Sequence, residues 1–205
     1  MTLLLLQTGL LETGLTGAIG AGIVFVEAGL AKLRHRELVP GVVANYRLLP
    51  ESLVQPVATL LPVVELGVGL GLIASVLTAS GLNAGDLNVG DLNFGVTGGG
   101  GLRLFALPAA ALLVVFAWAM AINIRRGRRA IDCGCGRSQL RQPLGWGLVV
   151  RNVVLALLVA IRALPGESAS AVEIALALIA GITLFAIILL FNALAALAAS
   201  PLKSR

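Results

Sequence analysis

Residues 172–199 read VEIALALIAGITLFAIILLFNALAALAA, with no charged residue after Glu173. A helix of that length rises about 40 Å, more than the roughly 30 Å hydrocarbon core of a bilayer. The segment therefore predicts a membrane-spanning helix. The rest of the chain is similar in character, because hydrophobic residues make up 58% and charged residues only 12% of its 205 residues. So few charges cannot cover the surface of a soluble domain of this size.

Four more apolar segments are long enough to cross a bilayer. The expected spans cover residues 14–33, 56–80, 102–124, 144–164 and 172–199. The predicted fold is all-α, a polytopic transmembrane helical bundle of about five spans that forms one integral membrane domain over residues 1–205. Residues 2–11 lack the basic start and cleavage site of a signal peptide, so we expect them to be retained at the outer interface.

The connection at residues 81–101 is rich in glycine, aspartate and asparagine. Spaced Asp and Asn oxygens could hold calcium, but the twelve-residue calcium-loop pattern with its closing glutamate is absent. A flexible, solvated outer loop is the favoured interpretation.

The positions of lysine and arginine predict the orientation. Cytoplasmic loops of membrane proteins carry an excess of these residues. Assigning alternate connections to the cytoplasm places twelve basic residues inside and two outside, with Arg151 inside a span. The chain is therefore expected in the inner (plasma) membrane, its N-terminus outside and its C-terminus and third connection in the cytoplasm. The net charge of +5 is explained by orientation, so no nucleic-acid partner is expected.

The two cysteines of the chain, Cys133 and Cys135, lie in that third connection and are separated by one glycine. A disulfide between them would close a very small ring, and strain in such a ring favours reduction. Arg128, Arg129 and Arg137 would stabilise a thiolate electrostatically. The pattern favours a redox-active pair over a structural staple.

Two other interpretations of the cysteines stay open. They could be structural or incidental thiols, or they could contact a metal ion with ligands from a partner. A metal site within this chain is not expected, because the one histidine, His35, lies in a different connection.

Polar residues inside the expected spans form a second candidate site. Glu27, Glu65, Arg151 and Asn152 interrupt three of the apolar segments. Counted from the cytoplasmic ends, the three charged residues lie roughly 8–14 Å deep, on the same side as the cysteines. Charged groups at that depth are costly and mark functional sites or buried pairs.

Pairing between these residues would reduce the cost. We expect Glu65 to pair with Arg151, either as a structural ion pair or as a polar pocket that binds a quinone head group or relays protons. Glu27 could instead pair with Lys32 or Arg34 near the interface. The cofactor is otherwise unknown.

Several motifs together resemble the methylamine-utilisation protein MauE family, which is grouped with DoxX-like redox-associated membrane proteins. Residues 123–136 read NIRRGRRAIDCGCG, followed by Trp146 and the pair Arg151–Asn152. Shorter matches are GLAKL at 29–33, NYRLLP at 45–50 and LPVVEL at 61–66. The resemblance covers roughly residues 17–160. The phenylalanine that the family usually carries after its second cysteine is missing here.

The resemblance implies a four-helix core plus one C-terminal helix, and an accessory role in maturing the disulfide-rich small subunit of methylamine dehydrogenase. A thioredoxin-like protein and the disulfide-rich client are the implied partners. The family's Cys-Gly-Cys corresponds to Cys133 and Cys135, and its intramembrane polar positions correspond to Glu65 and Arg151. The cytoplasmic position expected for the cysteines conflicts with disulfide formation on a secreted client.

Three functions follow, in order of preference. The first is a redox accessory protein whose cysteine pair exchanges with a thioredoxin-like partner, which would make it a thiol-disulfide oxidoreductase or a quinone-linked accessory. The second is a non-catalytic membrane scaffold or assembly factor, in which the cysteines would be dispensable. The third is a small-solute carrier, although the chain lacks the internal repeats that transporters often show.

Overall fold

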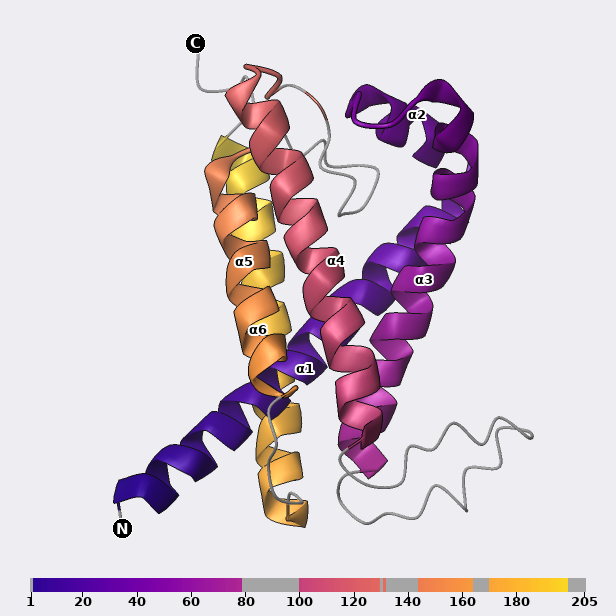
Figure 1. Cartoon of the computed structure of the whole chain (residues 1–205). Coiled ribbons are helices and arrows are strands. Elements are labelled where there is room, and N and C mark those ends of the chain that lie inside the picture. The colour runs from indigo at the N-terminus through magenta and orange to yellow at the C-terminus, as the bar shows by residue number, and fades with distance from the viewer. Residues whose placement is uncertain (1, 79–99, 130, 132–143, 164–169, 199–205) are drawn as a thin grey trace, which may run out of the picture.

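The structure is a computed structural model that describes residues 2–78, 100–129, 131, 144–163 and 170–198. Within these ranges the chain is helical and contains no strand. Its elements are α1 (Thr2–Arg34), α2 (Val39–Asn45), α3 (Glu51–Thr78), α4 (Gly100–Arg125), α5 (Trp146–Ile161) and α6 (Ala171–Ala198) (Figure 1). The predicted all-α bundle is confirmed.

Four helices are long and apolar enough to cross a membrane: Glu12–Arg34, Glu51–Leu77, Leu104–Arg125 and Ala171–Leu194. The fourth predicted segment, residues 144–164, forms the shorter apolar helix α5 of 16 residues. At 1.5 Å per residue α5 rises only about 24 Å. The architecture is that of a multi-pass helical membrane protein, with α5 as its shortest apolar element.

The N-terminal helix begins earlier than the sequence predicts. Residues 2–11 continue directly into the rest of α1, so they form part of one helix of 33 residues. The predicted loop 81–101 lies outside the described residues except at its end, where Gly100 begins α4.

α1 is the central helix of the bundle. Figure 1 shows it running obliquely between α3 on one side and α5 and α6 on the other. Glycines allow these close approaches: a Cβ on Gly17 would lie 2.5 Å from Cβ of Leu158, and one on Gly22 would lie 3.1 Å from the carbonyl oxygen of Gly69. In membranes small residues let backbones approach in this way, and the van der Waals packing they permit stabilises helix pairs.

Two glycine-to-alanine substitutions, one at a close contact and one in open space, test this packing. Replacing Gly17 with alanine is expected to lower stability by about 1–3 kcal/mol, because the new methyl group overlaps the α5 backbone at Leu158. Thermal unfolding of the purified protein in detergent micelles measures the effect. Gly67→Ala is the matched control, since a Cβ there meets nothing within 4 Å. Equal unfolding temperatures for the two variants would contradict close α1–α5 packing.

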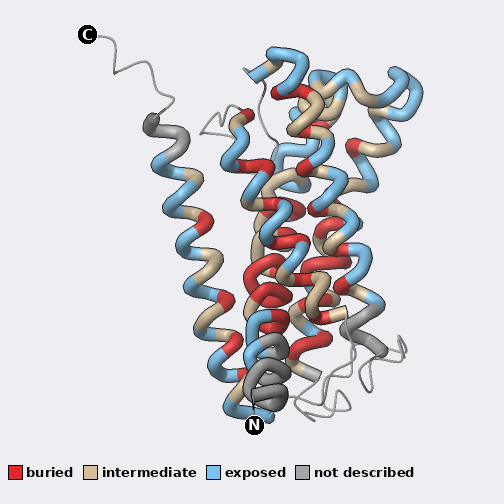
Figure 2. Tube along the Cα trace, turned by 60° about the vertical axis from the view of Figure 1, so that its left-hand side comes forward, coloured by how far each residue is buried: buried red, intermediate tan, exposed pale blue. Residues whose placement is uncertain are grey.

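Two apolar clusters hold the helices together. The larger joins side chains of α1, α3, α4, α5 and α6, whereas the smaller lies mainly between the C-terminal part of α4 and the start of α5. Figure 2 shows the buried residues gathered inside the bundle, while α6 stands at the periphery and diverges toward its C-terminal end. α6 is also the least buried of the four long spans. Most of the apolar surface of α6 is therefore exposed on the outside of the bundle, as expected for a helix that faces lipid.

The start of α6 is fixed by a reciprocal cap. Glu173 accepts a hydrogen bond from the backbone N–H of Ser170 at 2.6 Å, and the Ser170 hydroxyl accepts one from the backbone N–H of Glu173 at 3.3 Å. This capping box satisfies two backbone donors at a helix end. Glu173, the one charged residue of the segment 172–199, thus has a structural role.

Candidate functional site

Cys133 and Cys135 lie outside the described residues, but both ends of their connection are described. The backbone N–H of Leu144 donates a 2.9 Å hydrogen bond to the carbonyl oxygen of Arg129. The two ends of the connection, at Arg129 and Leu144, therefore lie side by side. Ile131, two residues before Cys133, is half-buried.

A small apolar cluster lies beneath this connection, and we call it the loop-base cluster. Its buried members come from α4 and from the start of α5, and Ile131 and Tyr46 pack against it. Tyr46 belongs to the turn between α2 and α3, so the first half of the chain contacts the base of the cysteine connection. The buried members of the cluster are Ala117, Met120, Ile124, Leu144, Leu148 and Val149.

The turn that carries Tyr46 also reaches the end of α4 through its backbone. Nη1 of Arg126 donates to the carbonyl oxygen of Arg47 at 3.5 Å, and Arg47 itself has a φ of 48°. A non-glycine residue in the left-handed region is uncommon and costs conformational energy. The hydrogen bond and the left-handed conformation of Arg47 thus fix the shape of the turn beside the end of α4.

Two of the arginines predicted to stabilise a thiolate are described. Arg128 donates from Nη1 to Oδ1 of Asn123 at 3.3 Å, which holds its guanidinium beside the C-terminal end of α4. Asn123 is fully buried, and its Nδ2 donates to the carbonyl oxygen of Ala119 at 3.1 Å. Arg129 is exposed, and Arg137 lies outside the described residues.

Glu65 pairs with Lys32, not with Arg151 as predicted. Nζ of Lys32 lies 2.8 Å from Oε1 and 2.7 Å from Oε2 of Glu65, so the ammonium contacts both carboxylate oxygens. The Glu65 side chain is 1% exposed and that of Lys32 is 13% exposed. Close approach of α1 and α3 one helical turn before Lys32 makes the pair geometrically accessible, since a Cβ on Gly29 would meet Leu66 and the carbonyl of Pro62.

Arg151 is bonded within a different group. Its Nη1 donates to Oδ1 of Asn192 on α6 at 2.8 Å, and its Nη2 donates to Oδ1 of the adjacent Asn152 at 3.5 Å. The hydrogen bonds therefore divide the predicted polar pocket into an α1–α3 pair and an α5–α6 group. Asn192 was missed, although it is the only amide in the apolar segment from 172 to 199.

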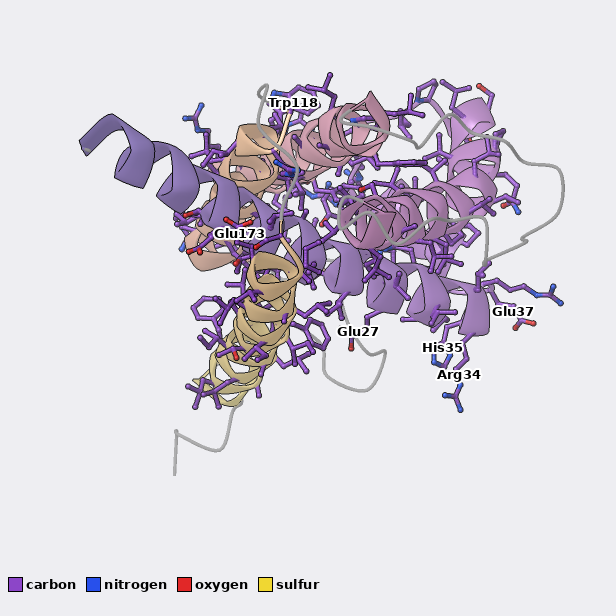
Figure 3. The ribbon with its side chains drawn as sticks, turned by 90° about the horizontal axis from the view of Figure 1, so that it is seen from below. Glu27, Arg34, His35, Glu37, Trp118 and Glu173 are labelled. Carbon is purple, nitrogen blue, oxygen red and sulfur yellow. The ribbon has the colours of Figure 1, made fainter. Side chains whose placement is uncertain are left out.

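Lys32, one of the two partners expected for Glu27, binds Glu65. Glu27 is half-buried on α1. Figure 3 shows its side chain projecting outward from the helix, while Arg34, His35 and Glu37 cluster beyond the end of α1.

Comparison with known proteins identifies the family. The family described as "Methylamine utilisation protein MauE" matches residues 10–165. The "Methylamine utilization protein MauE" of Paracoccus denitrificans is 41% identical over 186 residues, which cover 89% of this chain and 87% of that protein. The protein of the same name from Methylorubrum extorquens is 47% identical over 135 residues, covering 66% of this chain and 60% of that one. The chain belongs to the MauE family. No solved structure matches it.

The region shared with the MauE family contains nearly all of the candidate site. Residues 10–165 include the cysteine pair, the Lys32–Glu65 ion pair, and both Arg151 and Asn152. α6 begins at Ala171, beyond that region, and supplies Asn192. Arg151 lies within the region that the MauE family matches, and its hydrogen-bond acceptor Asn192 lies on α6, beyond that region.

Proposed function

We propose that this MauE-family protein is a membrane accessory protein in methylamine utilisation that exchanges thiols and disulfides through Cys133 and Cys135. The observation that carries the proposal is the position of the chain's two cysteines in a connection whose ends are joined by the Arg129–Leu144 hydrogen bond. The names of the relatives from Paracoccus denitrificans and Methylorubrum extorquens support the link to methylamine utilisation.

The surroundings of the connection support a reactive pair. Covalent reach alone limits Cα of Cys133 to within about 7 Å of Cα of Ile131, which packs on the loop-base cluster. Arg128 and Arg129 belong to the same end of the bundle, and positive charge favours the thiolate that carries out exchange. Arg137 would add to this effect.

The exchange needs a partner with a thiol or disulfide of its own. A thiolate of the pair attacks a sulfur of the partner, a mixed disulfide forms, and the second thiolate releases it. Two electrons and two protons are thereby transferred between the proteins. We propose a thioredoxin-like protein as that partner, and maturation of a disulfide-rich client as the result.

The proposed orientation places the pair at the cytoplasmic face of the inner membrane and the N-terminus outside. Arg125 ends α4, and Arg126, Arg128 and Arg129 follow it closely, as expected for a cytoplasmic connection. Glu65, Arg151, Asn152 and Glu27 act in this proposal as polar support within the membrane beneath the pair.

Labelling with a membrane-impermeant maleimide tests both the redox state and the sidedness. We expect the cysteines to be labelled in inverted vesicles and not in intact cells, and labelling to increase after mild reduction because part of the pair is oxidised. The reference for outer access is Thr97→Cys in a chain whose two native cysteines are serine. Labelling that reduction leaves unchanged would refute a redox couple, and labelling of intact cells would reverse the orientation.

A further inference from the structure

Two buried hydrogen-bond donors in the α5–α6 group have no partner. They are Nε of Arg151 and Nδ2 of Asn152. Both residues lie in the second turn of α5, where Asn152 is buried, at 2% exposed, and Arg151 is half-buried. Unsatisfied donors are rare in protein interiors and costlier still in a bilayer, where water cannot bind them.

The orientation of the Asn152 amide follows from chemistry. A guanidinium can only donate hydrogen bonds, so the amide oxygen must face Nη2 of Arg151. Nδ2 is then necessarily the atom directed away from it. Turning the amide over would place two donors against each other and leave an unpaired oxygen instead.

The charge of Arg151 is also not balanced by an acid within the described ranges. The ion pair in those ranges joins Lys32 to Glu65, and the two acceptors of Arg151 are neutral amide oxygens. A cation inside a membrane-spanning helix usually has an anionic partner or a functional role. The group therefore combines two free donors with uncompensated positive charge.

We infer that Arg151 and Asn152 bind the head group of a membrane quinone. A quinone has carbonyl oxygens that accept hydrogen bonds, and it is neutral and soluble in the bilayer core. Its oxygens become negatively charged on reduction, which the Arg151 cation would stabilise. A phospholipid phosphate fits less well, because it remains at the hydrated surface, whereas Asn152 is one of the buried residues of α5, as are Leu148 and Leu155.

The inference rests on the proposed function and specifies the direction of electron transfer, from the thiols to the quinone. When the thiols of Cys133 and Cys135 form a disulfide, they lose two electrons and two protons. A quinone accepts the same two electrons and two protons at its two carbonyl oxygens and becomes a quinol. The chain has no further cysteine to take these electrons. The regenerated disulfide could then oxidise the thiols of the partner.

Binding is tested on the full chain in lipid nanodiscs, with decylubiquinone as the probe. Both cysteines are replaced by serine, so that binding is measured apart from thiol chemistry. We expect saturable quenching of tryptophan fluorescence and a higher unfolding temperature on addition of the quinone. Asn152→Leu should weaken binding about tenfold, the effect of one lost hydrogen bond that is not replaced. Arg151→Gln should weaken it at least as much.

Ser75→Ala is the matched control, because Ser75 is equally buried but donates to the carbonyl of Leu72. It should leave the affinity unchanged. Without quinone, the unfolding temperature of Asn152→Leu measures the structural effect of losing both the unpaired Nδ2 and the acceptor of Nη2 of Arg151, apart from any effect on binding. Absence of saturable binding, or equal affinity in parent and Asn152→Leu chains, would overturn the inference. Stabilisation by phosphatidylglycerol in place of quinone would do so as well.

A second measurement separates the two proposals. The chain with both cysteines, reduced and kept anaerobic, should convert one decylubiquinone to quinol for each pair of thiols lost. Binding without thiol loss would leave the quinone site standing and remove the redox function. Thiol oxidation by a chemical oxidant with no binding of quinone would do the reverse.

Discussion

Replacing Glu65 with alanine is expected to destabilise the protein by about 3–5 kcal/mol, because it leaves the ammonium of Lys32 buried without its anion. The carboxylate contacts Nζ of Lys32 through both oxygens and is 1% exposed, so water cannot replace it. Lys32→Met should have an effect of the same sign, because it removes the cation that contacts the buried carboxylate of Glu65. Unfolding of the purified variants in mixed micelles measures the loss.

The double variant Lys32→Met with Glu65→Leu separates the value of the pair from the cost of breaking it. Because two well-packed apolar side chains avoid burying any charge, its stability should recover to within about 1 kcal/mol of the wild type. Glu37→Ala is the control for loss of an acidic residue, since Glu37 is exposed between α1 and α2. If Glu65→Ala unfolded like the Glu37 variant, the ion pair would not be a buried one.

The position of this pair illustrates what the sequence could not supply. Counting residues from the ends of apolar segments assigned a depth to Glu65 and to Arg151. It gave no information on which side of each helix they project from. Partner choice depends on that rotation, and on the approach of α1 to α3 at Gly29, which the sequence shows only as one small residue among many.

For a similar reason, the sequence did not show that α1 is the central helix of the bundle. Glu27 interrupts its apolar run, and its hydropathy of 1.6 is the lowest among the four long spans. It is nevertheless the most buried of them, because it packs against α3, α5 and α6. A central helix needs small residues for close approach more than it needs hydropathy, and its glycines that contact neighbouring helices are Gly14, Gly17, Gly20, Gly22 and Gly29.

The five apolar helices were predictable because apolar run length determines them, whereas the short helix α2 was not predicted. Residues 172–199 became α6 within about one residue at each end, and the all-α bundle follows from the same run lengths. The division of the polar residues into two groups was not predictable, because hydrogen bonds between helices distant in sequence depend on how the helices pack. Asn192 and Arg151 are 41 residues apart and meet only through that packing.

Replacing either Cys133 or Cys135 with serine is expected to abolish function without changing stability. Thiol exchange requires two sulfurs, one to attack and one to release the mixed disulfide, so a single serine stops turnover completely. The fold should persist because the two apolar clusters join the helices through side chains of the described residues. Growth on methylamine, in a Paracoccus denitrificans strain that lacks its own MauE and carries this chain, measures the loss.

Each single serine variant should differ in what it accumulates. If Cys135 is the releasing sulfur, Cys135→Ser should retain the partner as a mixed disulfide on Cys133, visible as a reducible higher-mass band, whereas Cys133→Ser should not. Ser138→Ala lies in the same connection and serves as the control that leaves both sulfurs in place. Growth of both serine variants at the wild-type rate would mean that the chain supports methylamine utilisation as a scaffold.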